Sequence, residues 1–209
     1  MIRAPKALWR SFLQKNYQFY CIITFILCLG ITVGSLAACN MKGEQTVAIQ
    51  ELLEYFLIQV GTLKFSSMDL IRLSVFNDIL LIVIIYLLGL TVIGMPIMLA
   101  LIFSRGFILG FTVSFLLKEK AFQGILLASA AILPQNLLYI PALVAGGATA
   151  LSFTMVLFKR NFGSNIKIGP VFLCYNGIML TILTLAMGSS LVEAYITPFL
   201  TKFAVRMIT

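Results

Sequence analysis

A run of 39 residues, from Ile79 to Leu117, contains a single charged side chain, that of Arg105. A helix needs about 20 apolar residues to cross a bilayer, so this run is too long for one crossing and long enough for two. Gly94-Met95-Pro96 lies near its middle, where glycine and proline favour a turn between helices. We therefore expect an integral membrane protein, built from helices, short loops and a few polar groups between them.

The composition leaves room for little besides membrane helices. The chain of 209 residues is 61% hydrophobic and only 11% charged, with a mean hydropathy of +1.06, whereas a soluble domain is nearer half apolar. We interpret residues 1–209 as a single integral membrane domain. The net charge of +8 is attributed to loop lysines and arginines that orient the helices, and no segment has the basic, aromatic face of a nucleic-acid-binding protein.

The side chains that most enzymes use are scarce. The chain has no histidine and only seven carboxylates, which excludes histidine general bases, Ser-His triads and most zinc sites. Its four cysteines form no CxxC pair, so no redox or metal motif is present. The sequence predicts a protein that is not an enzyme, with no catalytic, cofactor-binding or metal-binding residues.

The N-terminal region predicts the orientation of the first helix. Residues 1–18 carry four basic side chains and no acid, and an apolar run follows from Phe19 to Cys39, which places the N-terminus in the cytoplasm. Leu36-Ala37-Ala38-Cys39 also resembles a lipoprotein cleavage site. A signal-peptide core spans only about 7–15 residues, so the longer run favours an uncleaved anchor helix.

Residues 40–74 form the one substantial polar segment, which lies outside the membrane if the first helix enters from the cytoplasm. Apolar residues recur here at helical spacing, among them Leu53 and Phe56. This pattern predicts an amphipathic helix on the outer membrane surface. The segment is either a solvated connector with an apolar face or a docking platform for an outer partner.

The segment from Ala121 to Leu133 is about half a membrane thick as a helix, and Pro134-Gln135-Asn136 and Pro141 follow it. A proline and two amides in apolar sequence free backbone groups that other protein groups must satisfy. The segment is either a re-entrant half-helix before one span or the first of two short spans. Gln135 and Asn136 either join helices through hydrogen bonds or line a transport site.

The basic residues favour one topology. Six simple spans would place five of them outside the cell, against the positive-inside tendency: Lys118, Lys120, Lys159, Arg160 and Lys167. We therefore expect an all-α, polytopic membrane helix bundle with about five crossings, one re-entrant segment and an outer amphipathic helix. The N-terminus is then cytoplasmic and the C-terminus outside.

Arg105 lies in the middle of an apolar stretch. Placing an arginine without a partner at the centre of a membrane helix costs roughly 3 kcal/mol or more of insertion free energy. Its partner could be Asp78, Glu193 or carbonyls freed at Pro134. Alternatively, its long side chain reaches the membrane surface. Gly106 and Gly110 follow it as a GxxxG pair, the spacing at which membrane helices approach closely, and Gly30 and Gly34 repeat this spacing in the first helix.

Two stretches carry a resemblance to a known family: LLGLTVIGMPIMLALIFSRGFILGFTVSFLL and LLASAAILPQNLLYIPALVAGG. With the basic N-terminus, the first span and the outer segment, they make nearly the whole chain similar to the stage II sporulation protein M family of spore-forming Firmicutes. More distant relatives carry His-Gly and a Glu where this chain has Gln135-Asn136 and Tyr139. Chemistry that depends on that histidine is therefore not carried over.

The resemblance implies a non-catalytic membrane scaffold for forespore engulfment. In the family, the protein joins stage II sporulation proteins D and P, which degrade peptidoglycan, at the septal membrane of the mother cell, and it helps recruit and stabilise the P protein. The alternative from the residues alone is a permease-like transporter with a site at residues 134–141. An intramembrane enzyme is the weakest reading, and the sequence leaves self-association open.

Overall fold

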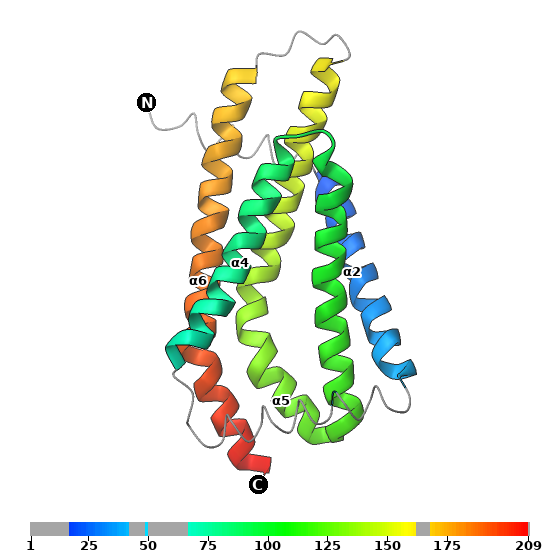
Figure 1. The fold of residues 1–209 in the computed structure, drawn as a ribbon, viewed down its shortest axis with the longest axis vertical. Helices are drawn as coiled ribbons and strands as arrows, with labels where there is room; N and C mark the ends of the chain where they lie inside the picture. Colours follow the sequence, from blue (N-terminus) through cyan, green and yellow to red (C-terminus); the bar gives the residue numbers. More distant parts are fainter. Residues whose placement is uncertain (1–16, 42–48, 50–66, 162–167, 209) are drawn as a thin grey trace.

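The computed structural model describes residues 17–41, 49, 67–161 and 168–208, and within these ranges it is helical without strands. The helices are α2 (Tyr17–Asn40), α4 (Ser67–Gly89), α5 (Gly94–Asn161) and α6 (Ile168–Ile208), shown in Figure 1. The predicted all-α membrane fold is confirmed. Leu53 and Phe56, on the predicted outer helix, lie outside the described residues.

Helix α5 doubles back on itself. In Figure 1 it descends from its start, bends at its lower end and returns upwards beside α4. We call residues 94–118 its first arm and residues 136–160 its second arm. Both arms are long and apolar enough to cross a membrane, as are α2 and the Ile168–Ser190 part of α6. Helix α4 adds a shorter apolar stretch, Phe76–Gly89.

The predicted turn near Gly94-Met95-Pro96 is confirmed, because α4 ends at Gly89 and α5 begins at Gly94. The Thr91 hydroxyl accepts a hydrogen bond of 3.2 Å from the Gly94 N–H, as a capping side chain does at a helix start. Pro96 lies in the first turn of α5, where a missing N–H costs no helical hydrogen bond.

The interruption predicted at Pro134-Gln135-Asn136 is not present, because α5 is helical through both Pro134 and Pro141. Residues 121–133 therefore continue into the second arm without a break in the helix. Proline removes one backbone hydrogen bond, but other polar groups can satisfy the backbone that it frees. The Asn136 side-chain amide donates to the Ile132 carbonyl at 2.8 Å, in the turn beside Pro134.

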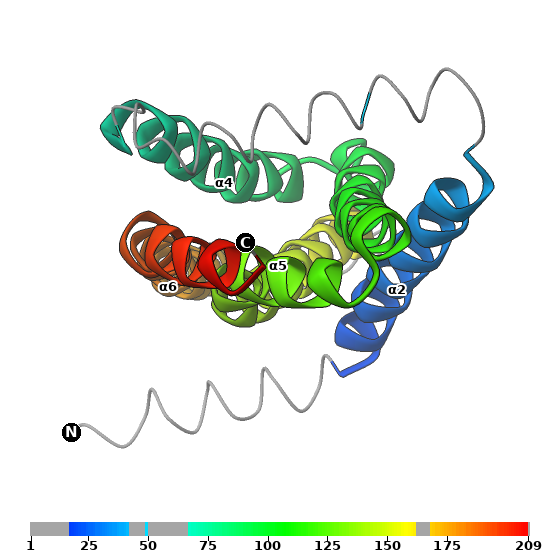
Figure 2. The same ribbon diagram turned by 90° about the horizontal axis from the view of Figure 1, so that it is seen from below.

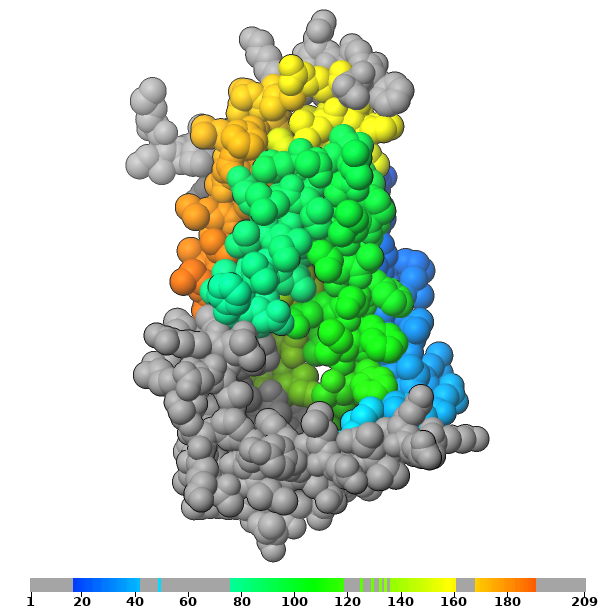
Figure 3. Space-filling model, viewed as in Figure 1, coloured from blue at the N-terminus to red at the C-terminus, as the bar shows by residue number. Residues whose placement is uncertain are grey.

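The second arm of α5 is the central helix of the bundle. Of its most apolar stretch, 61% is buried, against 28% for each of the other three long spans. Small residues let neighbouring helices approach it closely, and several of them are at most 1% exposed, among them Ala142, Ala148, Thr149, Ala150 and Thr154. Figure 2 shows α2, α4 and α6 arranged around α5, and Figure 3 shows α4 in contact with its first arm.

The contacts fix the directions of the helices. Along α2 and the first arm of α5, Gly30 faces Phe103, Gly34 faces Phe107 and Ser35 bonds to Ser114, so the two helices run parallel. The start of α2 and the turn at residues 90–93 therefore share one end of the bundle, which we call the turn end; the end of α5 lies there too, because Thr154 bonds to Gly89. Lys159 and Arg160 lie there, and Lys118 lies at the opposite end.

Candidate functional site

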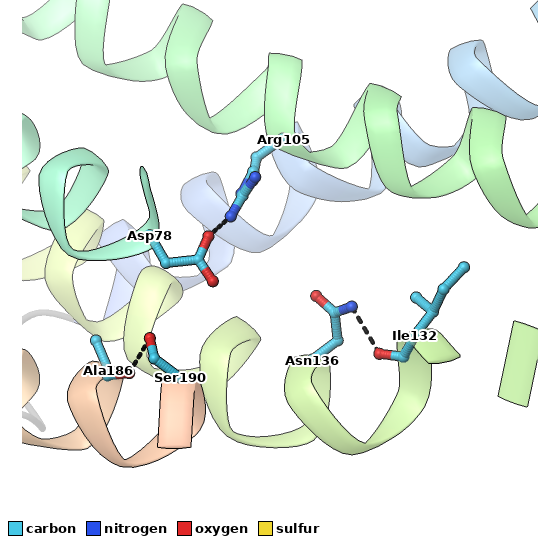
Figure 4. A network of polar contacts seen from close by, with 6 residues as sticks. All are labelled: Asp78, Arg105, Ile132, Asn136, Ala186 and Ser190. Carbon is cyan, nitrogen blue, oxygen red and sulfur yellow. Dashed lines mark hydrogen bonds and ion pairs between the residues drawn. The ribbon is translucent and has the colours of Figure 1, made fainter. Parts of the chain in front are cut away.

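The centre of the candidate site is an ion pair between Arg105 of α5 and Asp78 of α4, drawn in Figure 4. The Arg105 side chain is 18% exposed and that of Asp78 only 2%. Of the two readings of Arg105, pairing with a carboxylate is therefore the one that the structure shows. Asp78 is the partner, rather than a carbonyl at Pro134.

The ion pair lies deep in the hairpin that α4 forms with the first arm. Asp78 precedes Gly89 by 11 residues and Arg105 follows Gly94 by 11 residues, so each is about 16 Å from the turn along its helix. Half of the hydrocarbon core of a bilayer is about 15 Å. The two charges are therefore near the middle of the membrane thickness, where a charge without a partner is costly.

Helix α4 begins before the span that the sequence suggests. That span begins near Val75 with Asp78 at its outer end, whereas the helix begins at Ser67, so that Asp78 is the twelfth of its 23 residues. The charged residues Asp69 and Arg72 lower the hydropathy of the first two turns. These charged residues do not prevent helix formation, because backbone hydrogen bonds form in water as well as in a membrane and need no apolar side chains.

A third side chain completes the ion-pair site. The Arg105 guanidinium lies 4.9 Å from the ring centre of Tyr139, which comes from the second arm and is 1% exposed. An arginine over an aromatic face is attracted by the ring electrons, by about 2 kcal/mol when water is excluded. Arg105 therefore joins α4 and both arms of α5 at one point.

Two further polar side chains lie in the same region, as Figure 4 shows. Asn136 donates to the Ile132 carbonyl at 2.8 Å, and Ser190 of α6 donates to the Ala186 carbonyl at 3.1 Å. Both bonds stay within one helix and run from a side chain to the carbonyl four residues earlier. The amide N–H of Asn136, a candidate transport contact, is thus used by its own helix here. The side chain of Gln135 lies outside the described residues.

Gly106 and Gly110 form the second part of the site, a close seam between α2 and the first arm of α5. A Cβ atom on Gly106 would clash with the Leu27 carbonyl, and one on Gly110 with the Ile31 carbonyl. The same holds from the other side for Gly30 and Gly34, against Phe103 and Phe107. In all four cases the distance from the added Cβ atom to the facing carbonyl oxygen would be well under 3.0 Å, a separation that real Cβ atoms almost never go below. The two GxxxG pairs therefore pack against each other, backbone to backbone.

Polar contacts hold the seam at its far end. The hydroxyls of Ser35 and Ser114 lie 2.6 Å apart, and the Lys118 ammonium donates to the carbonyls of Cys39 at 3.1 Å and Met41 at 2.8 Å. The last carbonyls of a helix have no partner within it and carry partial negative charge. Lys118 therefore caps α2 from the neighbouring helix.

The sequence gives no hint of one further contact set, at the turn end. Thr154 donates to the Gly89 carbonyl at 2.9 Å, and Tyr175 donates to the Tyr86 carbonyl at 2.8 Å. Tyr175 also stacks on Phe153, with ring centres 4.4 Å apart. These contacts tie the end of α4 to the second arm and to α6. In the sequence, these contacts correspond only to single hydroxyl or aromatic residues within apolar helices. Such residues are too common to predict which of them pair.

The comparisons with known proteins identify the family. The family model for stage II sporulation protein M matches residues 23–198. The chain belongs to this family. The matched range includes the ion pair and the glycine seam, so both are parts of the family region of this sporulation-related membrane protein. A comparison with curated proteins and one with solved structures found no match. No group of three or more metal-ligating side chains occurs among the described residues.

Proposed function

We propose that this protein is a non-catalytic membrane scaffold for forespore engulfment. It recruits and stabilises peptidoglycan hydrolases, stage II sporulation proteins D and P, at the septal membrane of the mother cell. Membership of the stage II sporulation protein M family supports a role in sporulation. The observation that favours a scaffold is that the charged pair in the bundle joins three helical segments to one another.

A scaffold needs a rigid support for the surface that its partners contact. Helix α2 is locked to the first arm of α5 by the glycine seam, and α4 is locked to the same arm by Asp78 and Arg105. Residues 42–66, the larger part of the predicted outer segment (residues 40–74), lie between these two helices in the chain. Both ends of the outer segment are thus attached to helices that are packed tightly against the same arm of α5, which suits a docking platform.

The outer segment offers the most direct test of this function. Phe56→Asp places a charge on its predicted apolar face and should weaken recruitment of the P-type hydrolase without preventing membrane insertion. The control is Gln50→Asp, which adds the same charge to another face of the predicted helix. Fluorescence imaging of the tagged hydrolase at the septum gives the readout, together with immunoblots of the scaffold. Normal septal localisation in a Phe56→Asp strain with normal scaffold levels would contradict the docking role.

A further inference from the structure

A groove with a volume of about 520 Å³ runs between α4 and α6. Its walls are mainly aliphatic, formed by Ile82 and Val83 of α4 and by Leu173, Leu180 and Leu183 of α6. Gly177 lies in the wall, and a Cβ atom there would have nothing within 4 Å. The groove is therefore an open, apolar space between two apolar helices, of which α6 is long enough to cross a membrane.

The length of the groove suits a lipid chain better than a partner helix. On α6 it extends from Leu173 to Leu183, ten residues further along the chain, which is about 15 Å of helix. This is about half of the hydrocarbon core, the depth of one leaflet. A transmembrane helix of a partner needs about 30 Å of contact to follow α6 through the whole core.

Basic side chains lie beyond one end of the groove. Phe153 of the second arm stacks on Tyr175 and lies 6.1 Å from Phe172, measured between ring centres. Lys159 and Arg160 follow six and seven residues later, about 9–10 Å closer to the turn end, and both are exposed. The first turn of α6 contains no acidic residue. Two exposed cations therefore lie on the turn-end side of the groove, on the helix that packs against α6 through Phe153 and Tyr175.

One polar pair lies in the groove wall at a suitable depth. The Tyr86 hydroxyl donates to Oδ1 of Asn176 at 2.6 Å. Tyr86 is three residues from the end of α4, which is about 4–5 Å along the helix. Polar atoms thus occur near the basic end of the groove, at the level where a phospholipid carries its ester groups, and Ile82, Val83, Leu180 and Leu183 lie deeper.

We propose that the α4–α6 groove binds one acyl chain of an anionic phospholipid, whose headgroup lies beside Lys159 and Arg160. Basic residues close to the ends of membrane helices are known to bind such headgroups. Lipid binding at this groove is independent of the scaffold role, because it is measured on the purified protein without any hydrolase.

Native mass spectrometry of the full chain in a neutral detergent tests the proposal, with phosphatidylglycerol and phosphatidylcholine of identical acyl chains as probes. Gly177→Leu fills the groove and should weaken binding of both lipids at least tenfold. Gly188→Leu is the matched control, because a Cβ atom on Gly188 also has nothing within 4 Å but the residue does not line the groove. It should bind both lipids as the wild type does.

Removing the basic residues tests the headgroup separately. Each contributes about fivefold to anionic lipid binding, so Lys159→Gln with Arg160→Gln should lower phosphatidylglycerol affinity roughly 30-fold and leave phosphatidylcholine affinity unchanged. If the wild type does not prefer phosphatidylglycerol, or if Gly177→Leu binds it normally, the proposal is wrong and the groove has another occupant, such as a partner helix. If Gly177→Leu does not fold, Gly177→Ala takes its place, because it adds one methyl group to the same wall and nothing lies within 4 Å of the new atom; unchanged binding of both lipids would contradict the groove as the site.

Discussion

The ion pair in the bundle gives the sharpest quantitative test. Arg105→Leu deprives Asp78, which is 2% exposed and near the middle of α4, of its guanidinium partner. A charged side chain at the centre of a membrane helix costs about 2.5–3.5 kcal/mol. The free energy of unfolding should therefore fall by about 3 kcal/mol, which lowers the folding equilibrium constant more than 100-fold. Unfolding in mixed detergent micelles, followed by circular dichroism, measures this change.

A double-mutant cycle separates the pair from the individual residues. Asp78→Leu should also destabilise the protein by about 3 kcal/mol, since it leaves Arg105 without the carboxylate. The double variant, Arg105→Leu with Asp78→Leu, buries no charge and should be close to the wild type, because apolar replacement of a buried pair is often neutral. Asn77→Leu is the matched control: Asn77 is next to Asp78 but exposed, so its loss should change stability little.

The aromatic contact predicts the behaviour of the conservative variant. Arg105→Lys keeps the charge but loses the planar group that can bond to a carboxylate and lie over the Tyr139 ring. It should recover only part of the stability that Arg105→Leu loses. The reasoning would be refuted if Arg105→Leu unfolded like the wild type, or if the double variant were as unstable as the two single variants added together.

Three further perturbations address the rest of the site. Gly34→Ala places a Cβ atom against the Phe107 carbonyl and should cost about 1–3 kcal/mol, whereas Gly169→Ala, with nothing within 4 Å of the new atom, should not destabilise the protein in the same assay. Lys118→Met removes the bonds to the Cys39 and Met41 carbonyls, and faster amide hydrogen exchange in the last turn of α2 should follow. Asn136→Leu removes one hydrogen bond, so it should lower stability by about 0.6–2 kcal/mol and leave sporulation normal once the protein is overexpressed. A stable, abundant Asn136→Leu protein that fails in sporulation would instead favour a transport site.

Local chemistry made part of this structure predictable. The turn before Gly94 follows from glycine, threonine and proline within a few residues, and the GxxxG faces follow from spacing along one helix. The need of Arg105 for a partner follows from the cost of a charge in hydrocarbon. Each of these depends only on neighbouring sequence and on the membrane as solvent.

What sequence reasoning missed depends on the packing of distant segments. Choosing Asp78 over Glu193 as the partner of Arg105 requires the true start of α4 at Ser67 and the register of the hairpin. The capping of α2 by Lys118 requires that two helices some 80 residues apart run parallel. The continuity of α5 through Pro134 depends on how polar groups around the proline satisfy the backbone, which composition alone does not specify.

The first arm of α5 has a position that links stability to the proposed function. It holds α2 through the glycine seam and α4 through Arg105, and these are the helices that precede and follow residues 42–66. Disturbing either contact lets the two ends of the outer segment move relative to each other. If that segment docks hydrolases, then Gly34→Ala and Arg105→Leu should both reduce hydrolase recruitment although neither residue belongs to that segment. The double ion-pair variant, which restores the packing without the charges, should restore recruitment as well.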